Sequence, residues 1–252
     1  MLNFDITAAS RTGLVRENNE DMIVVGEWFV RDGKMRTHFS TKNVERYLLA
    51  LADGMGGHNS GEVASSEALH NLQFFFNDIP GGLPSSEFNE LIFEWLQSVN
   101  AIFVSKGHVD QRLRDMGTTL VSLVYYHGEF YWMNCGDSRL YRLHDGHLTL
   151  LTTDHSLNNL YGDPQHSNYI TNCIGGGCKT SFIDITVCTD SICDGDTFLL
   201  CSDGLNDMLP DSEIERLLLE GNDADSLCAA ADSVGGFDNV SACVIKVQEI
   251  KE

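Results

Sequence analysis

Apolar and β-branched residues gather in short runs that predict strands. Near the N-terminus, runs separated by polar and glycine-containing segments predict strands over Leu2–Ala9, Met22–Val30 and Arg46–Ala52. After Gly117 the runs follow one another closely, and Asp145-Gly146 suits the tight turn of a hairpin. Further strands are predicted over Thr118–Tyr126, Glu129–Asn134, Arg139–Leu143, His147–Leu151, Ser181–Val187, Thr197–Cys201 and Val240–Gln248.

Other segments place apolar residues three or four positions apart, which predicts helices with one buried face. The clearest extends from about Ser86 to Lys106, where aliphatic and aromatic side chains recur at this spacing. The others run from a cap at Asn59 or Ser60 to about Asn77, from a cap at Asp211 or Ser212 to Leu219, and over Asp225–Val234.

The order of these elements decides the fold class. Strands follow one another in antiparallel runs and the helices are grouped rather than alternating with strands, so we expect an α+β fold. About ten strands exceed one comfortable open sheet, which favours two packed antiparallel sheets with helices outside them. The chain has 252 residues, and we expect a single domain over residues 1–252.

The charge balance narrows the classes of partner. Sixteen Lys and Arg against 37 Asp and Glu give a formal charge of −21. Such a surface repels nucleic acid and anionic membranes, so we expect neither as a partner. No run approaches the ~20 apolar residues of a membrane-spanning helix, and Met1–Asp5 lacks the features of a signal peptide. We therefore expect a cytoplasmic protein, and a monomer.

Four aspartates stand in glycine-marked turns beside predicted strands: Asp53, Asp137, Asp203 and Asp238. Each Asp-Gly pair alone is a common turn. Together they suggest more, because strand ends bring distant carboxylates together and hard cations such as Mg²⁺ and Mn²⁺ prefer oxygen ligands. Neighbouring glycines let the backbone approach an ion closely. The sequence therefore predicts a dinuclear metal site.

With their flanking residues, these turns resemble the metal-dependent protein phosphatases, also called type 2C serine/threonine phosphatases, and are most similar to the bacterial branch. The resemblance follows the family's order of motifs over nearly the whole chain. It is carried by residues 10–21, Asp53–His58, Gly61–Ser65, Met116–Thr119, Gly136–Arg139, Thr153–Ser156, Ser202–Leu205 and Gly236–Asn239. It implies a four-layer α-β-β-α sandwich with the metal site at one end, in agreement with the predicted elements.

The resemblance also implies a metal-ligand set. Asp53 would bridge two Mn²⁺ or Mg²⁺ ions, and the carbonyl of Gly54 would complete the shell of one of them. Asp203 and Asp238 would bind the ions from the other sheet. Asp53, Asp203 and Asp238 are thus the expected catalytic residues.

Four further residues receive supporting roles from the resemblance. Glu20 and Asp21 would hold metal-bound waters, and Asp137 together with Asp203 would hold a weaker third ion. Arg16 would bind the substrate phosphate, a role that suits the planar fork of donors on a guanidinium. A surface ion pair with a neighbouring carboxylate is the alternative for Arg16.

The implied activity is hydrolysis of phosphoserine and phosphothreonine in proteins by a metal-activated water, without a covalent intermediate. A serine/threonine kinase and its targets would be the natural partners. Two alternatives stay open: a phosphatase for small molecules on the same fold, and a regulatory binding module with weak or no catalysis. The second predicts lost metal ligands, whereas the three expected aspartates are present.

Two departures from the family pattern concern the leaving group and the substrate. Met55 stands where eukaryotic members carry a histidine that is a candidate general acid. His58 and His155 are then candidates, and for each a loop histidine with satisfied hydrogen bonds is an equally good interpretation. The flap region over residues 155–177 is short, and since this region contacts substrate in the family, substrate preference is left open.

The eight cysteines are expected to be reduced thiols. Cys135, Cys201 and Cys243 lie in or beside apolar runs and are predicted to be small core residues. Cys173, Cys178, Cys188 and Cys193 are spaced like a loose zinc clip, but structural zinc sites use tighter spacings. Free thiols are the preferred interpretation of this group.

Overall fold

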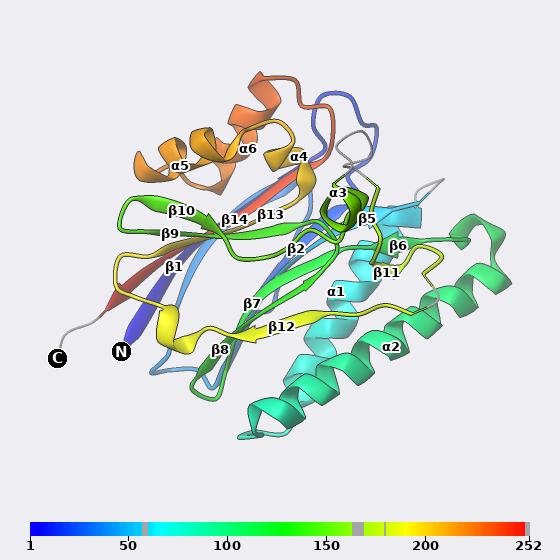
Figure 1. Ribbon diagram of the computed structural model, residues 1–252, viewed down its shortest axis with the longest axis horizontal. Helices are drawn as coiled ribbons and strands as arrows, with labels where there is room; N and C mark the ends of the chain where they lie inside the picture. The colour runs from blue at the N-terminus through cyan, green and yellow to red at the C-terminus, as the bar shows by residue number, and fades with distance from the viewer. Residues whose placement is uncertain (57–59, 163–168, 179, 250–252) are drawn as a thin grey trace.

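The computed structural model describes residues 1–56, 60–162, 169–178 and 180–249, which form four layers (Figure 1). Two antiparallel sheets pack face to face, and helices cover the outer face of each. The predicted α-β-β-α sandwich is confirmed. That residues 1–252 make one domain stays a prediction. Within the described residues, no helix is long and apolar enough to cross a membrane.

The first sheet joins the two ends of the chain. Its strand order is β10-β9-β13-β14-β1-β4, and β1 pairs with β14 from Leu2 opposite Glu249 to Arg11 opposite Val240. The strands are β1 (Leu2–Arg11), β4 (Gly33–Ser40), β9 (Arg139–His144), β10 (His147–Leu150), β13 (Thr197–Cys201) and β14 (Val240–Glu249).

The second sheet has the order β11-β6-β5-β7-β8-β12, with β2 paired to β5 and β3 paired to β2. Its strands are β2 (Asp21–Val25), β3 (Trp28–Val30), β5 (Arg46–Met55), β6 (Gly117–Thr118), β7 (Leu120–Tyr126), β8 (Glu129–Cys135), β11 (Ile174–Gly175) and β12 (Asp184–Val187). Both sheets therefore contain strands that lead directly into or out of the aspartate turns.

The helices separate into two groups. The helices α1 (Ser60–Asp78) and α2 (Ser85–Val109) cover the second sheet. The helices α4 (Asp203–Asn206), α5 (Asp211–Leu219) and α6 (Ala224–Ser233) cover the first. Shorter pieces are η1 (Gln111–Leu113), α3 (Leu157–Tyr161) and η3 (Thr189–Ser191).

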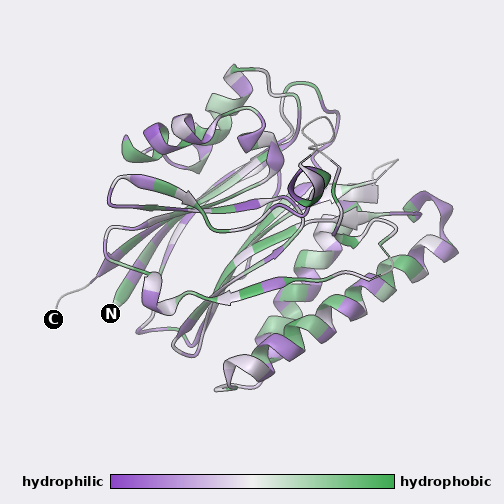
Figure 2. Cartoon of the chain, in the orientation of Figure 1, coloured by the Kyte–Doolittle hydropathy of each residue, from purple (hydrophilic) through white to green (hydrophobic). Residues whose placement is uncertain are grey.

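Three apolar layers hold the sandwich together. Between the sheets, Phe4 stacks on Phe39 with ring centroids 4.5 Å apart. Under α2, Phe88, Ile92 and Phe103 are buried on one helix face, as the apolar spacing predicts. Figure 2 shows hydrophobic and hydrophilic residues alternating along this helix. The third layer lies between the first sheet and α4 to α6.

Several predicted boundaries are wrong for local reasons. The strand predicted over Met22–Val30 is a hairpin, because Gly26 takes a left-handed conformation at φ 60° and turns the chain between β2 and β3. The edge strand β4 was not predicted, since Met35 and Phe39 are its only apolar residues. The pieces α3, α4, β6 and β11 are too short for their pattern to be read from sequence.

The predicted cap of α5 is wrong, and the predicted cap of α1 at Asn59 is not tested. Ser60 lies inside α1, and the carboxylate of Glu20 accepts hydrogen bonds from the first-turn amides of Gly61 and Glu62. Asn59 lies outside the described residues. Asp211 is the first residue of α5 rather than its cap. A distant carboxylate thus satisfies helix amides that the sequence pattern assigns to a local cap.

Candidate metal centre

The two sheets bring four aspartates to one end of the sandwich. Asp21 at the start of β2 lies directly opposite Asp53 near the end of β5. Asp203 is the first residue of α4 and follows the end of β13 by two positions. Asp238 lies two positions before the start of β14. Asp53 from one sheet and Asp203 from the other lie close enough for each to shift the pKa of the other. Residues far apart in sequence therefore form one acidic cluster, which joins Asp21 to three of the four aspartates of the turns.

Asp21 is the most deeply buried member of this cluster, with no exposed surface. Its Oδ2 accepts a hydrogen bond of 2.7 Å from the Ser202 hydroxyl, whereas its Oδ1 has no hydrogen-bond partner. Burial, with a smaller contribution from the charge of Asp203, raises the pKa of Asp21 to about 7. A buried carboxyl oxygen without a partner is costly, and a cation would satisfy it.

Asp53 is fixed through its backbone. Its amide donates to the Thr119 hydroxyl at 3.0 Å, and its carbonyl accepts from the Thr119 amide at 2.9 Å. Burial and then the neighbouring Asp21 charge raise the pKa of Asp53 well above its ordinary value. Burial and the charge of Asp238 likewise raise the pKa of Asp203 to about 6. The carboxyls destabilise one another's ionised forms, which bound cations would reverse.

Gly54 occupies a position that tolerates no side chain. A Cβ atom there would lie 2.1 Å from the Gly61 carbonyl oxygen and 2.7 Å from that of Glu20. The same close approach lets the Gly54 amide donate to the Glu20 carbonyl at 3.2 Å. The backbone of β5 therefore packs directly against the start of α1 beside Asp53.

Arg16 reaches the cluster from the loop after β1. Its Nη2 donates to Asp238 Oδ2 at 2.7 Å, and the arginine side chain remains half exposed. The structure thus shows an ion pair, which was the alternative for Arg16, but its partner is the distant cluster residue Asp238 and not a carboxylate neighbouring in sequence. A guanidinium has five N–H donors, so donors beyond the one bound to Asp238 are available to an anion.

Asn239 was not predicted as a site residue, although it lies in Gly236–Asn239, one of the segments that carry the family resemblance. Its side-chain amide donates to the carbonyls of Thr12 at 2.9 Å and Asn18 at 2.8 Å. Its Oδ1 accepts from the Glu20 amide at 2.8 Å. Asn239 therefore fixes the loop that carries Arg16 to the strand end that carries Asp238. Ser202, which binds Asp21, was also missed; only its place next to Asp203 pointed to it.

Asp137 lies in the turn between β8 and β9 and is buried. Its Oδ1 has no hydrogen-bond partner, and burial followed by the charge of Asp203 raises its pKa to about 8. Gly136 before it has φ 124°, a conformation that favours glycine. Asp137 therefore extends the cluster on the side of Asp203, where a third ion was predicted.

His155 is a loop histidine with satisfied hydrogen bonds. Its Nδ1 accepts from the Gly136 amide at 3.1 Å and lies 2.8 Å from the Asn172 amide nitrogen. Its Nε2 lies 3.0 Å from Asp184 Oδ2 and, with Nδ1 accepting, is the nitrogen that carries the proton. His155 therefore supports the Asp137 turn, as one of the two interpretations predicted. His58 lies outside the described residues, as do residues 163–168 of the flap region.

The donors in this cluster fit divalent cations. They are carboxyl oxygens and the backbone carbonyl oxygen of Gly54. Mg²⁺ and Mn²⁺ prefer oxygen ligands of these kinds. Two of them, Asp21 Oδ1 and Asp137 Oδ1, are buried without hydrogen-bond partners. Burial, and then repulsion among the carboxyls, raises the pKa values of Asp21, Asp53 and Asp137. Each observation is one that ion binding would resolve.

Comparison with known proteins identifies the family. A sequence model described as protein phosphatase 2C matches residues 35–232. This chain belongs to the protein phosphatase 2C family. It is 32% identical over 250 residues to the serine/threonine protein phosphatase PstP of Mycobacterium tuberculosis, covering 95% of this chain and 44% of that protein. The chain thus spans less than half the length of that relative.

Other members of the protein phosphatase 2C family match over more of their own length. The serine/threonine phosphatase stp of Listeria monocytogenes is 31% identical over 215 residues, or 79% of this chain and 84% of that protein. The Streptococcus agalactiae serine/threonine phosphatase structure has a TM-score of 0.80 at 25% identity, covering 98% and 100% of the chains. The PstP catalytic domain in complex with two manganese ions has a TM-score of 0.75 at 31% identity, covering 99% and 100%.

The cysteines of this protein phosphatase 2C chain do not gather into one site. Cys173 and Cys178 have their sulfurs 3.6 Å apart, but Cys188 lies in the core between the sheets and Cys193 is exposed beside Asp196. The prediction that Cys135, Cys201 and Cys243 are core residues is confirmed, since all three are buried.

Among the described residues, one His/Cys/Asp/Glu group has its ligand atoms all within 4.8 Å of one another: His144, Cys193 and Asp196. The buried Asp196 carboxylate there already accepts from Arg142 at 2.8 Å and from the Cys193 amide at 2.8 Å. It also lies 2.6 Å from His144 Nδ1. These contacts satisfy Asp196 without an ion. Among the described residues, no three ligand atoms of the aspartate cluster lie this close together.

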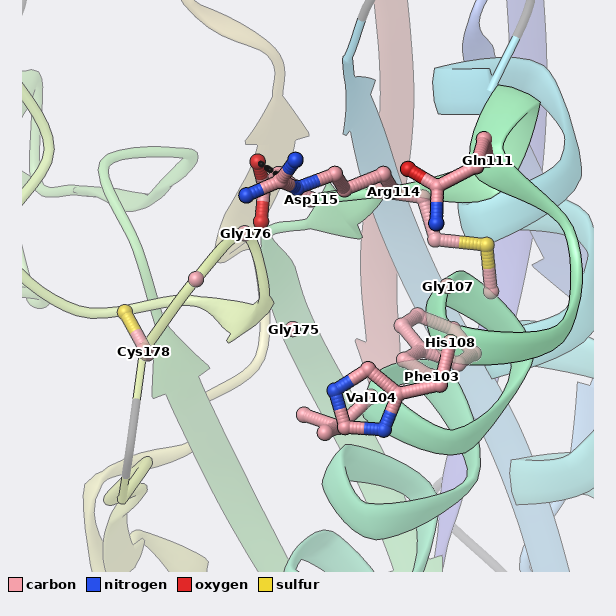
Figure 3. Close-up of a pocket in the computed structure, with 12 residues that line it drawn as sticks. Phe103, Val104, Gly107, His108, Gln111, Arg114, Asp115, Gly175, Gly176 and Cys178 are labelled. Carbon is pink, nitrogen blue, oxygen red and sulfur yellow. Dashed lines mark ion pairs between the residues drawn. The ribbon is translucent and has the colours of Figure 1, made fainter.

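A separate pocket of about 500 Å³ lies between the end of α2 and the glycine turn that follows β11 (Figure 3). Its lining includes His108, Arg114 and Cys178, but none of the four clustered aspartates. The chemistry of the metal centre therefore belongs to the acidic end of the sandwich and not to this pocket.

Proposed function

We propose that this chain is a metal-dependent phosphatase that hydrolyses phosphoserine and phosphothreonine in proteins. The observation that carries the proposal is the acidic cluster, in which buried carboxyls from both sheets converge with raised pKa values and partnerless oxygens. Membership of the protein phosphatase 2C family supports the reaction class.

In this proposal, Asp53, the Gly54 carbonyl, Asp203 and Asp238 hold two Mn²⁺ or Mg²⁺ ions. The PstP catalytic domain, of similar fold, contains two manganese ions, which supports this number. Asp137 and Asp203 hold a third, weaker ion. When bound, the ions lower the pKa of water toward neutrality and offset the charge of the phosphoryl oxygens. The ions also favour the ionised form of each carboxyl that holds them.

The protein's own groups position these ligands and the substrate. The Ser202 hydroxyl orients Asp21, and the α1 amides hold Glu20, so both acids can bind ordered water beside the ions. Arg16 binds the substrate phosphate through guanidinium donors not used by Asp238. Asn239 follows Asp238 in the chain and binds the loop that carries Arg16. It therefore holds Arg16 and Asp238 in place relative to each other.

No protein nucleophile is required. Cys201 lies two residues before Asp203, but it is buried in an apolar layer and burial raises the pKa of its thiol far above neutrality. A thiolate is therefore not available there. Direct attack by water on phosphorus, in line with the seryl or threonyl leaving group, fits the carboxylate-rich site.

The first test measures hydrolysis of p-nitrophenyl phosphate with Mn²⁺, with Mg²⁺ and with EDTA. Turnover that needs the metal and is lost in Asp203→Asn supports the proposal. The matched control is Asp5→Asn, an exposed carboxylate on β1, which retains activity. Folded, metal-loaded wild type without turnover would make the regulatory binding module the better interpretation.

The second test separates protein substrates from small molecules. Phosphothreonine peptides, sugar phosphates and nucleotides are compared by kcat/KM with the same metal. A preference for peptides supports the protein-phosphatase assignment and a cognate kinase as partner. A preference for small phosphorylated molecules would favour the other alternative, and gel filtration tests the expected monomer.

A further inference from the structure

Two loops at the metal end expose a group of apolar side chains. Leu14 and Val15 lie in the loop after β1, while Val234 and Phe237 lie in the loop between α6 and β14, and all four are exposed. We name these four residues the rim patch. Single exposed apolar residues are ordinary, but a contiguous group beside a site is typical of a binding surface.

The two loops that carry the rim patch are in contact. The Leu14 amide donates to the Gly236 carbonyl at 2.8 Å, and the loops lie side by side in Figure 1. A Cβ at Gly236 would lie 2.9 Å from Leu14 Cγ, and one at Gly235 would lie 2.7 Å from the Phe237 ring. Leu14 and Phe237 therefore pack over the same pair of glycines.

The rim patch adjoins the groups expected to bind phosphate. Arg16 is two residues after Leu14, Asp238 directly follows Phe237, and these two charged side chains are themselves paired at 2.7 Å. An extended peptide advances ~3.3–3.6 Å per residue. We therefore expect the residues next to a phosphate bound at Arg16 to reach the rim patch.

We propose that the rim patch binds an apolar side chain that lies within about three residues of the phosphorylated residue. This inference rests on the proposed function and specifies its substrate class. A peptide is favoured over an anionic membrane because the chain carries a formal charge of −21. It is favoured over a second copy of the chain because the patch borders a site that substrate must enter.

The test compares phosphothreonine peptides that carry leucine or serine at one position within three residues on either side of the phosphothreonine. For each variant the readout is the ratio of kcat/KM for the leucine peptide to that for the serine peptide. This ratio cancels any change in catalysis that both peptides share. Wild type should prefer leucine by about tenfold at one or more positions, since a partly buried leucine gains apolar contact.

Phe237→Ser and Leu14→Ser should each bring this ratio close to one. The matched control is Phe74→Ser, because Phe74 on α1 is 70% exposed and Phe237 is 61% exposed, but Phe74 is not part of the rim patch. The control should keep the wild-type ratio. Circular dichroism confirms that each variant is folded before kinetics.

The outcomes separate the two proposals. Hydrolysis of all peptides with a ratio near one at every position, or a ratio unchanged by Phe237→Ser, overturns the rim-patch inference and leaves the phosphatase assignment standing. No hydrolysis of p-nitrophenyl phosphate or of any peptide overturns both. A loss of leucine preference equal in Phe74→Ser would show a general surface effect and would also contradict the inference.

Discussion

Arg16 Nη2 and Asp238 Oδ2 lie 2.7 Å apart although 222 positions separate these residues in the chain. The pair couples a predicted phosphate-binding group to a predicted metal ligand. Because the arginine is half exposed, the pair adds little to stability by itself. The main effect of the ion pair is to hold the Arg16 guanidinium at the edge of the acidic cluster.

Replacing Arg16 by alanine should therefore lower kcat/KM for p-nitrophenyl phosphate by about a hundredfold, the loss expected for a charge-assisted phosphate contact. Arg16→Lys should recover only part of it, since an ammonium lacks the planar fork. Arg112→Ala is the matched control, because Arg112 is also an exposed arginine 2.7 Å from an aspartate. Equal activity of Arg16→Ala and wild type would remove Arg16 from phosphate binding.

The metal-free protein should lose stability as pH rises. The pKa of Asp21 is about 7 in the folded protein and about 3.9 in an unfolded chain, so the folded state holds a proton that the unfolded chain releases. The stabilising contribution is fully present below about pH 4 and is lost as pH rises through about 7. In EDTA, we expect Tm to fall by about 5 °C between pH 5 and pH 8.

Asp21→Asn should flatten this pH dependence, because asparagine cannot ionise, whereas the exposed Asp5→Asn should leave it unchanged. Added Mn²⁺ should restore Tm at pH 8 by binding the ionised carboxyls of the folded state. Thermal denaturation followed by circular dichroism measures both effects. A Tm that rises with pH in EDTA would contradict the assignment.

Gly54→Ala should disrupt the metal centre. Its Cβ would lie 2.1 Å from the Gly61 carbonyl oxygen, and neither backbone segment has room to move. We expect destabilisation by about 1–3 kcal/mol and a large loss of metal-dependent turnover. The matched control is Gly33→Ala on β4, where the nearest atom to a new Cβ is 3.8 Å away. Urea denaturation and p-nitrophenyl phosphate kinetics provide the two readouts.

Asn239→Ala should act through the loop that it anchors. Three part-buried hydrogen bonds to segments on both sides of Arg16 are lost, which costs about 1–3 kcal/mol. We expect KM for phosphorylated substrates to rise more than kcat falls, because Arg16 is displaced. Asn222→Ala, which removes a bond of 2.9 Å to Leu217 far from this loop, is the control. An unchanged KM would show that Asn239 has only a structural role.

Much of this molecule could be predicted from sequence because its signals are local. The apolar spacing of α2 and the hairpins after Gly117 follow from side-chain periodicity and turn chemistry. The aspartate turns could be located because each borders an apolar strand. The edge strand β4 could not be located from sequence, because an edge strand needs few apolar residues.

The hydrogen bonds of the site are harder to predict from the sequence. The Glu20 carboxylate binds amides at the start of α1, and the pairing of Arg16 with Asp238 joins the two ends of the chain. Both contacts depend on how the layers of the sandwich pack together and not on residues that are neighbours in the sequence. The roles of Ser202 and Asn239 could be suspected only from their place inside motifs.

The pairing of β1 with β14 has a consequence for biosynthesis. Leu2 is opposite Glu249, so β1 stays without this neighbour until β14 has left the ribosome. The Arg16 loop and Asp238 meet only across that same pairing. A nascent chain that stops short of β14 therefore holds most of these acidic residues but has no assembled metal centre.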